Sequence, residues 1–190
     1  LQSGATIYTA LDPDKQAHDE QAINDILSRY DIQGSATVID NDTREIVSLY
    51  AGKDYKKFDL NRAYQAYRQP GSAFKPIAAY GPAFELGESY PGMGIDDVPV
   101  NFGGYKPTNW YGYYYGYVTA REALNQSMNI PAVKTLQLVN MDYAFQFAKN
   151  MGITTLTETN KNLSMALGSA NVRVIDMAAA YATMANGGVY

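Results

Sequence analysis

The sequence has no cysteine, and it has only one histidine and one tryptophan among its 190 residues. The lack of cysteine excludes a disulfide framework and any thiolate metal site. Lysine and arginine number 15 against 19 aspartates and glutamates, so a net charge of −4 gives no basis for nucleic-acid binding. No apolar run approaches the roughly 20 residues of a membrane helix. Hydrophobic residues nevertheless make up 46% of the chain, enough to bury a core.

Metal and cofactor chemistry find little support in the remaining polar residues. The carboxylates of Asp96 and Asp97 do not have the spacing of a calcium loop. The single histidine, His18, has acidic neighbours in a polar helical stretch. We therefore expect no metal and no cofactor, an exposed His18, and no Ser-His-Asp triad.

The pattern of apolar and turn-forming residues predicts a mixed α/β (α+β) domain, with helices packed on an antiparallel sheet. Asp12-Pro13 has the form of a helix N-cap followed by proline, and Thr119 with Glu122 forms a capping box. Residues 87–117 read as a long irregular connection. The predicted elements are a strand at 6–11, a helix from 13 to about 30, a hairpin of 36–39 and 46–49, and helices at 72–86, 131–139, 141–151 and 174–186, the last closed by Gly187.

Ser72 and Lys75 are the first candidates for catalysis. Ser72 begins a predicted helix, and Lys75 three residues later lies on the same helical face. A serine hydroxyl needs a base to become a nucleophile, and lysine can serve if burial lowers its pKa. A Ser-x-x-Lys tetrapeptide by itself is weak evidence, because it occurs by chance on exposed helices, where the lysine is simply solvated.

Ser127-Met128-Asn129 follows 55 residues later, between the capped helix and Ile130-Pro131. It can be a polar helix end, because Ser and Asn are common terminators and Pro131 restricts the residue before it. Alternatively, the Ser127 hydroxyl passes a proton between Lys75 and a leaving amine, and the Asn129 amide binds an acylamino substrate. Ser-x-x-Lys, a Ser-Asp-Asn type element and Lys-Thr-Gly together are the signature of penicillin-binding proteins and β-lactamases.

The stretch Gln69-Pro70-Gly71-Ser72-Ala73-Phe74-Lys75-Pro76 resembles the catalytic motif of penicillin-binding proteins, with flanks closest to the bifunctional class A enzymes. The other matching stretches are Pro107-Thr108-Asn109-Trp110, Val118 to Leu124, Ser127 to Lys134, and Ala179-Ala180-Tyr181-Ala182 running to Gly188. The resemblance covers the chain from Thr6 onward and implies the penicillin-binding transpeptidase fold.

The resemblance implies peptidoglycan cross-linking by a serine D,D-transpeptidase. Ser72 would attack the D-Ala-D-Ala carbonyl of a stem peptide, with Lys75 as general base, Ser127 as proton relay and Asn129 orienting the substrate. An acceptor amine would resolve the acyl-enzyme, and β-lactams would acylate Ser72. The family further implies a preceding glycosyltransferase domain, a membrane anchor outside this chain, and a location at the outer face of the cytoplasmic membrane.

Two other functions are compatible with the same motifs. In a D,D-carboxypeptidase or a β-lactamase, water resolves the acyl-enzyme. In a penicillin-sensing module, the serine is acylated without turnover.

The third family motif, Lys-Thr-Gly, is absent from the sequence. Lys134-Thr135-Leu136 is the nearest string, but it lies in a predicted helix and ends in leucine. We therefore expect residues 1–190 to be the N-terminal and central part of one transpeptidase domain. The strand with Lys-Thr-Gly would lie beyond Tyr190, in a C-terminal segment that packs on this one.

Tyrosine is unusually frequent, with 17 in the chain and many of them between Tyr105 and Tyr117. Such a stretch is typical of a surface loop packed on its own rings. It can also form a wall of a binding cleft, and in that case Trp110 is the candidate substrate contact.

Overall fold

The structure, a computed structural model, describes residues 4–189, which divide into two units. The first comprises residues 4–67 and 173–189, and the second Arg68–Val172. Each unit contains helices and a two-stranded antiparallel sheet, which confirms the expected mixed α/β class. None of the helices within 4–189 is long and apolar enough to cross a membrane.

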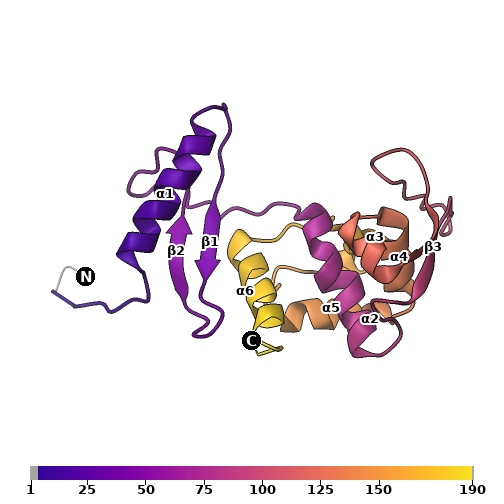
Figure 1. The fold of residues 1–190 in the computed structure, drawn as a ribbon. Coiled ribbons are helices and arrows are strands. Elements are labelled where there is room, and N and C mark those ends of the chain that lie inside the picture. Colours follow the sequence, from indigo (N-terminus) through magenta and orange to yellow (C-terminus); the bar gives the residue numbers. More distant parts are fainter. Residues whose placement is uncertain (1–3, 190) are drawn as a thin grey trace. The chain divides into compact units, whose positions relative to one another are not determined.

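The first unit is built around a hairpin of β1 (Ala36–Ile39) and β2 (Ile46–Tyr50), as predicted. Helix α1 (Pro13–Leu27) contacts β2, and helix α6 (Val174–Ala185) contacts β1 (Figure 1). Gly187 follows α6 with a positive φ of 84°, the conformation that ends many helices.

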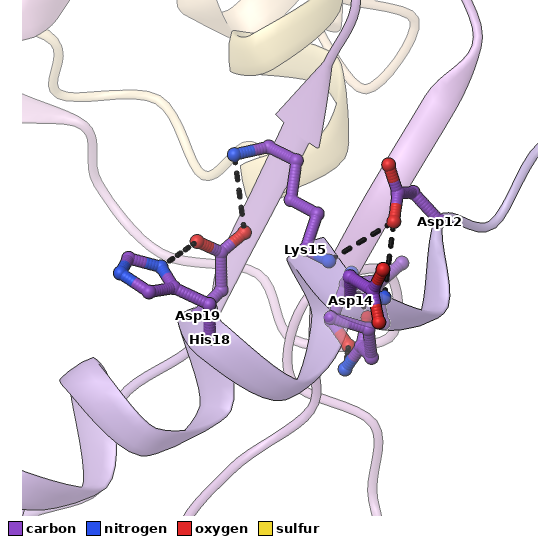
Figure 2. Close-up of polar contacts among 7 residues, drawn as sticks. Asp12, Asp14, Lys15, His18 and Asp19 are labelled. Atoms are coloured by element: carbon purple, nitrogen blue, oxygen red, sulfur yellow. Dashed lines mark hydrogen bonds and ion pairs between the residues drawn. The ribbon is translucent and has the colours of Figure 1, made fainter.

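Helix α1 starts where the sequence predicts. The Asp12 carboxylate accepts hydrogen bonds from the backbone N–H groups of Asp14 and Lys15, both at 3.0 Å (Figure 2). The helix ends at Leu27, because the backbone N–H groups of Arg29 and Tyr30 bond carbonyls only three residues back and turn the chain. Residues 28–30, expected to be helical, therefore form a turn.

The predicted strand at 6–11 is wrong. Its pairing edge on β2 is already occupied, because the Asp12 N–H donates to Val47 O at 2.9 Å. The Gln16 carboxamide also pairs with the Leu49 N–H at 2.8 Å and the Leu49 carbonyl at 3.1 Å. Helix α1 thus satisfies the free edge of the hairpin, and residues 6–11 run without a regular partner.

His18 lies on α1 with 81% of its side chain exposed, which confirms the expected exposure. Its Nδ1 is 3.5 Å from Asp19 Oδ1 on the same helix (Figure 2).

The second unit carries the candidate catalytic residues. Its elements, in chain order, are the 3-10 turn η1 (Gly71–Phe74), the π-helical turn η2 (Pro76–Tyr80), α2 (Gly81–Glu85), β3 (Gly94–Asp97), β4 (Gly116–Thr119), α3 (Ala120–Asn125), α4 (Asn129–Gln137), α5 (Met141–Asn150), and the 3-10 turns η3 (Glu158–Asn160) and η4 (Leu163–Leu167). The helices predicted at 131–139, 141–151 and 174–186 are thus confirmed, and each end lies within two residues of its predicted position.

The predicted helix at 72–86 exists but is not a regular α-helix. Pro76 and Pro82 have no N–H to donate, so the regular ladder is interrupted twice. The Gly81 N–H instead donates to the Pro76 carbonyl five residues back, which gives η2 its wide π-helical turn.

The connection at 87–117 is less irregular than predicted. Strand β3 pairs antiparallel with β4, from Gly94 opposite Thr119 to Asp97 opposite Gly116. A four-residue strand with one glycine and two aspartates lacks the apolar alternation by which strands are recognised. Only the packing shows it, since Ile95 and Asp97 are the buried pair of residues in β3.

Candidate active site

Ser72 and Lys75 lie on the most deeply packed segment of the second unit. Segments η1 and η2 contact η4, and η2 also contacts α4 and α5. Phe74 and Ile77 are fully buried on either side of Lys75, which is itself only 1% exposed. Ser72, at the beginning of this segment, is exposed. A buried lysine therefore stands three residues after a serine that solvent can reach.

A close backbone contact sets the position of η1. The Gly71 N–H donates to the Gly168 carbonyl at 3.3 Å. Gly168 has a φ of +70°, and a Cβ at this position would overlap the backbone of Gly71. Glycine is therefore required at 168, and it allows η4 to support the residue that precedes Ser72.

The Lys75 ammonium donates three hydrogen bonds, all to the Ser-x-Asn element. Its Nζ lies 2.5 Å from the Ser127 carbonyl, 3.1 Å from Ser127 Oγ and 2.8 Å from Asn129 Oδ1. The structure thus brings together three of the four residues that the sequence predicts for catalysis. Ser72, the fourth, lies on the same helical segment as Lys75 but is not among these three acceptors.

Burial lowers the pKa of Lys75 to about 8, because an ammonium loses hydration in a desolvated site. Two of its three partners, the Ser127 carbonyl and Asn129 Oδ1, can only accept hydrogen bonds. Only the Ser127 hydroxyl can reverse and donate to a neutral amine. Loss of a proton from Lys75 would therefore leave its lone pair available to a hydroxyl, either that of Ser127 or that of an approaching nucleophile.

Ser127 sits at the end of α3 in a conformation that usually selects glycine. Its φ is +52°, its N–H donates to Leu124 O at 3.0 Å, and the Met128 N–H donates to Ala123 O at 2.8 Å. These two bonds form a Schellman motif with Ser127 at the left-handed position. The element is therefore a polar helix end, and this end also points the Ser127 carbonyl and hydroxyl at Lys75. A proton-relay role for Ser127 stays a prediction.

We expect Ser127→Gly to raise stability and lower activity together. Glycine would relieve the left-handed strain, worth about 1 kcal/mol, but would remove the hydroxyl next to Lys75. Urea denaturation and the rate of penicillin acylation measure the two effects. Ser127→Ala is the matched control, because it loses the same hydroxyl but keeps a Cβ and therefore the strain of the left-handed backbone. Equal stability of the two variants, or undiminished acylation in both, would contradict this interpretation.

Asn129 is the first residue of α4, and both ends of its carboxamide are engaged. Oδ1 accepts from Lys75, while Nδ2 donates to the Thr108 carbonyl at 2.8 Å. One N–H of the amide and one lone pair of its oxygen remain for a substrate. The Asn129 backbone N–H donates to Asn109 Oδ1 at 3.0 Å.

The sequence did not predict two buried residues behind Asn129. Asn109, which is 5% exposed, donates to the carboxylate of Asp97, which is fully buried. Asn109 belongs to the Pro-Thr-Asn-Trp stretch that resembles the family, but that stretch indicates no role for it. The sequence pattern presents Asp97 only as a possible metal ligand, and no cluster of three or more His, Cys, Asp or Glu side chains suited to a metal occurs in the described part of the chain.

The tyrosine-rich stretch packs on its own rings. Tyr111 contacts Tyr113 and Tyr115, at 4.6 and 5.6 Å between ring centroids, and Trp110 contacts the Tyr111 ring edge-to-face at 5.5 Å. Trp110 is 80% exposed. The rings thus form the expected self-packed loop, and a contact of Trp110 with substrate stays a prediction.

Two sequence features that resemble site residues have structural roles. Glu122 completes the capping box of α3, accepting from the Thr119 N–H at 2.8 Å. Lys134 lies on α4 and pairs with Asp96 at 2.6 Å. Lys134 therefore does not take the place of the lysine of a Lys-Thr-Gly strand.

Comparison with known proteins shows the family of this chain. Residues 34–190 match the family model of the penicillin binding protein transpeptidase domain. Penicillin-binding protein 4 of Bacillus subtilis (strain 168) is 38% identical over 192 residues, covering 100% of this chain and 31% of that protein. Penicillin-binding protein 1A of Neisseria lactamica is 36% identical over 164 residues, covering 83% of this chain and 20% of that protein. The chain therefore spans less than a third of these relatives.

Among solved structures, the penicillin-binding protein PonA1 from Mycobacterium tuberculosis has a TM-score of 0.87 at 29% identity, covering 100% of this chain and 52% of that chain. The fold and the motifs together define a penicillin-binding transpeptidase domain. The chain belongs to this family, and its relatives are the class A penicillin-binding proteins.

Proposed function

We propose that this chain supplies the acylation machinery of a penicillin-sensitive D,D-transpeptidase that cross-links peptidoglycan stem peptides. The observation that carries the proposal is the buried Lys75, bonded to Ser127 and Asn129, three residues after the exposed Ser72. The assignment of Ser72, Lys75, Ser127 and Asn129 to catalysis belongs to this proposal.

In the first step, Ser72 Oγ attacks the carbonyl carbon of the D-Ala-D-Ala bond. Its proton passes to the neutral amine of Lys75. Because the pKa of Lys75 is about 8, a substantial fraction of the enzyme carries this neutral amine at neutral to mildly alkaline pH. The carbon–nitrogen bond then breaks. The departing D-Ala amine takes up the proton from the new ammonium, through the reversible Ser127 hydroxyl.

In the second step, the amino group of a neighbouring stem peptide attacks the acyl-enzyme. The same groups act in reverse, so that the amine loses a proton, the new amide forms and Ser72 recovers its hydroxyl. Asn129 orients the substrate amide with its remaining donor and acceptor.

β-Lactams would enter the first step as mimics of the dipeptide. PonA1 from Mycobacterium tuberculosis in complex with penicillin V has a TM-score of 0.84 to this chain at 29% identity. This similarity supports β-lactam binding here, with Ser72 as the residue that is acylated.

Further elements belong to the proposal through the much longer relatives. They are a glycosyltransferase domain, a membrane anchor outside this chain, and catalysis at the outer face of the cytoplasmic membrane. A segment with the Lys-Thr-Gly strand would complete the site. It would hold the substrate carboxylate and would supply one amide of the oxyanion hole.

We expect an acceptor amine to capture most of the acyl-enzyme. The full-length protein is acylated with a stem peptide that ends in D-Ala-D-Ala, and the products are separated by mass spectrometry with and without an added amino-acid acceptor. A transpeptidase gives mainly the aminolysis product, and its yield rises with acceptor concentration.

The Ser72→Ala variant is the control for reaction without the enzyme. A hydrolysis product that forms at the same rate with and without acceptor would indicate a carboxypeptidase or β-lactamase. A stable acyl-enzyme with neither product would indicate a sensing module. Both results contradict the proposal.

A further inference from the structure

Asp97 is a fully buried carboxylate whose contacts are all to neutral donors. It lies at the end of β3, where Oδ1 and Oδ2 accept from Asn109 Nδ2 at 2.8 and 2.9 Å. Oδ2 also accepts from the Tyr115 N–H at 2.9 Å. A buried carboxylate needs such donors to offset its lost hydration. The side-chain amide of Asn109 supplies two of the three hydrogen bonds that Asp97 accepts.

This contact leaves Asn109 only one orientation. Its Nδ2 faces three acceptors, the two oxygens of Asp97 and the Tyr113 carbonyl at 3.2 Å. A flipped amide would place an oxygen against these acceptors. The Asn109 Oδ1 must therefore point the other way, where it accepts the Asn129 backbone N–H at 3.0 Å.

Thr108 and Asn109 hold Asn129 from two sides. Asn109 takes its backbone N–H, which as the first N–H of α4 has no partner inside the helix. The Thr108 carbonyl takes Nδ2 of its side chain at 2.8 Å. With these two groups held, Asn129 Oδ1 points to Lys75 Nζ at 2.8 Å.

We infer that Asp97 and Asn109 are positioning residues for the proposed acylation: through Asn129 they fix where Lys75 Nζ stands beside Ser127. The inference rests on the proposed function for its catalytic consequence, but the chain of contacts from Asp97 to Lys75 is independent of it. Neither residue touches the reacting atoms. They act by keeping one acceptor aimed at the base.

A simpler role has to be distinguished. Asp97 also bonds Tyr115 and lies close to Tyr111, so it could serve only to anchor the aromatic loop. The two roles predict opposite changes at Lys75. Loosening the loop would admit water and raise the pKa of Lys75 towards its ordinary value of 10.5. Loss of positioning would remove the Asn129 acceptor from the ammonium, and would lower that pKa.

The decisive variant is Asp97→Asn in the full-length protein. The new amide cannot accept at both oxygen positions, so it sets a donor against Asn109 Nδ2 and turns the Asn109 amide away from Asn129. We expect the acylation rate by a fluorescent penicillin to fall on the order of 100-fold at its plateau, as misplaced catalytic groups do. The midpoint of its pH profile should move to lower pH.

Asp96→Asn is the matched control. It neutralises the adjacent carboxylate, which is half exposed and pairs with Lys134 outside this network. Its acylation rate and pH midpoint should equal those of the wild type.

The exchange Asp97→Asn with Asn109→Asp provides a rescue. It restores a donor facing an acceptor at that contact and leaves residue 109 able to accept the Asn129 N–H, while the bond to the Tyr113 carbonyl is lost, so the rescue is partial. The double variant should acylate faster than either single variant, which is the signature of a direct pair. Its pH midpoint should rise above that of Asp97→Asn, because the carboxylate then lies one step closer to Lys75.

Two results would overturn the inference: Asp97→Asn acylating like Asp96→Asn, or a pH midpoint that rises in Asp97→Asn with no rescue in the exchange. A second measurement separates this failure from failure of the proposed function. The Lys75 side-chain carbon resonance, assigned by its loss in Lys75→Arg, is titrated in wild type and Asp97→Asn. A lowered Lys75 pKa in a protein that does not acylate at all would support the positioning pair and contradict the transpeptidase.

Discussion

Ser72→Ala is expected to abolish covalent labelling by a fluorescent penicillin. The variant removes the only hydroxyl that precedes the buried Lys75 on its own helical segment, and loss of the nucleophile costs about 10⁶-fold in serine hydrolases. Ser72 is exposed at the surface, so its replacement removes no core packing. Labelling of the full-length protein, read by gel fluorescence and by mass spectrometry of the labelled peptide, measures the effect.

Ser28→Ala serves as the control for this experiment. Ser28 is an exposed serine at the end of α1 whose hydroxyl donates to the Asp25 carbonyl at 3.1 Å, and its loss should leave labelling unchanged. Labelling of Ser72→Ala at the wild-type rate, or a label that maps to another serine in the wild type, would show that Ser72 is not the nucleophile.

Lys75→Arg is expected to lower the acylation rate by about 10²- to 10⁴-fold, the range of general-base catalysis. An arginine keeps the positive charge and can donate to Ser127 and Asn129, but it does not lose a proton in proteins. Burial lowers the pKa of Lys75 to about 8. The wild-type rate should therefore rise as pH increases through about 8, where the neutral amine forms, and the residual rate of the arginine variant should show no such rise.

Lys134→Arg is the matched control, since Lys134 also bonds a nearby residue, Asp96, but lies outside the network of Lys75. Melting temperatures confirm that both variants fold. Near-normal acylation by a folded Lys75→Arg protein, or a wild-type rate that does not depend on pH between 7 and 9, would rule out Lys75 as a neutral base.

The local motifs were predictable because each depends on residues close together in the chain. The Asp12 cap, the Thr119–Glu122 capping box and the hairpin of β1 and β2 all satisfy backbone groups within a few residues. Ser72 and Lys75 belong to the same class, because three residues along a helical segment place them on one side.

The failures of prediction arise where a distant group changes the local preference. Residues 6–11 have a strand-like alternation, but the side chain of Gln16 and the backbone of Asp12 already occupy the edge of β2. Strand β3 has no strand-like composition, and it forms because β4 pairs with it. In both cases a hydrogen-bonding edge decided the structure, and such an edge is not a property of one segment.

The identities of the reactive groups can be read from the amino-acid sequence: a serine, a lysine and a Ser-x-Asn element in a set order, together with the family to which they point. The chemical behaviour of the lysine depends on the folded chain. Its burial between packed helices lowers its pKa, and its partners Ser127 and Asn129 lie 52 and 54 residues further along the chain. The Asp97–Asn109 pair behind Asn129 also depends on the tertiary structure. Desolvation and amide orientation depend on groups that meet only when the chain is folded.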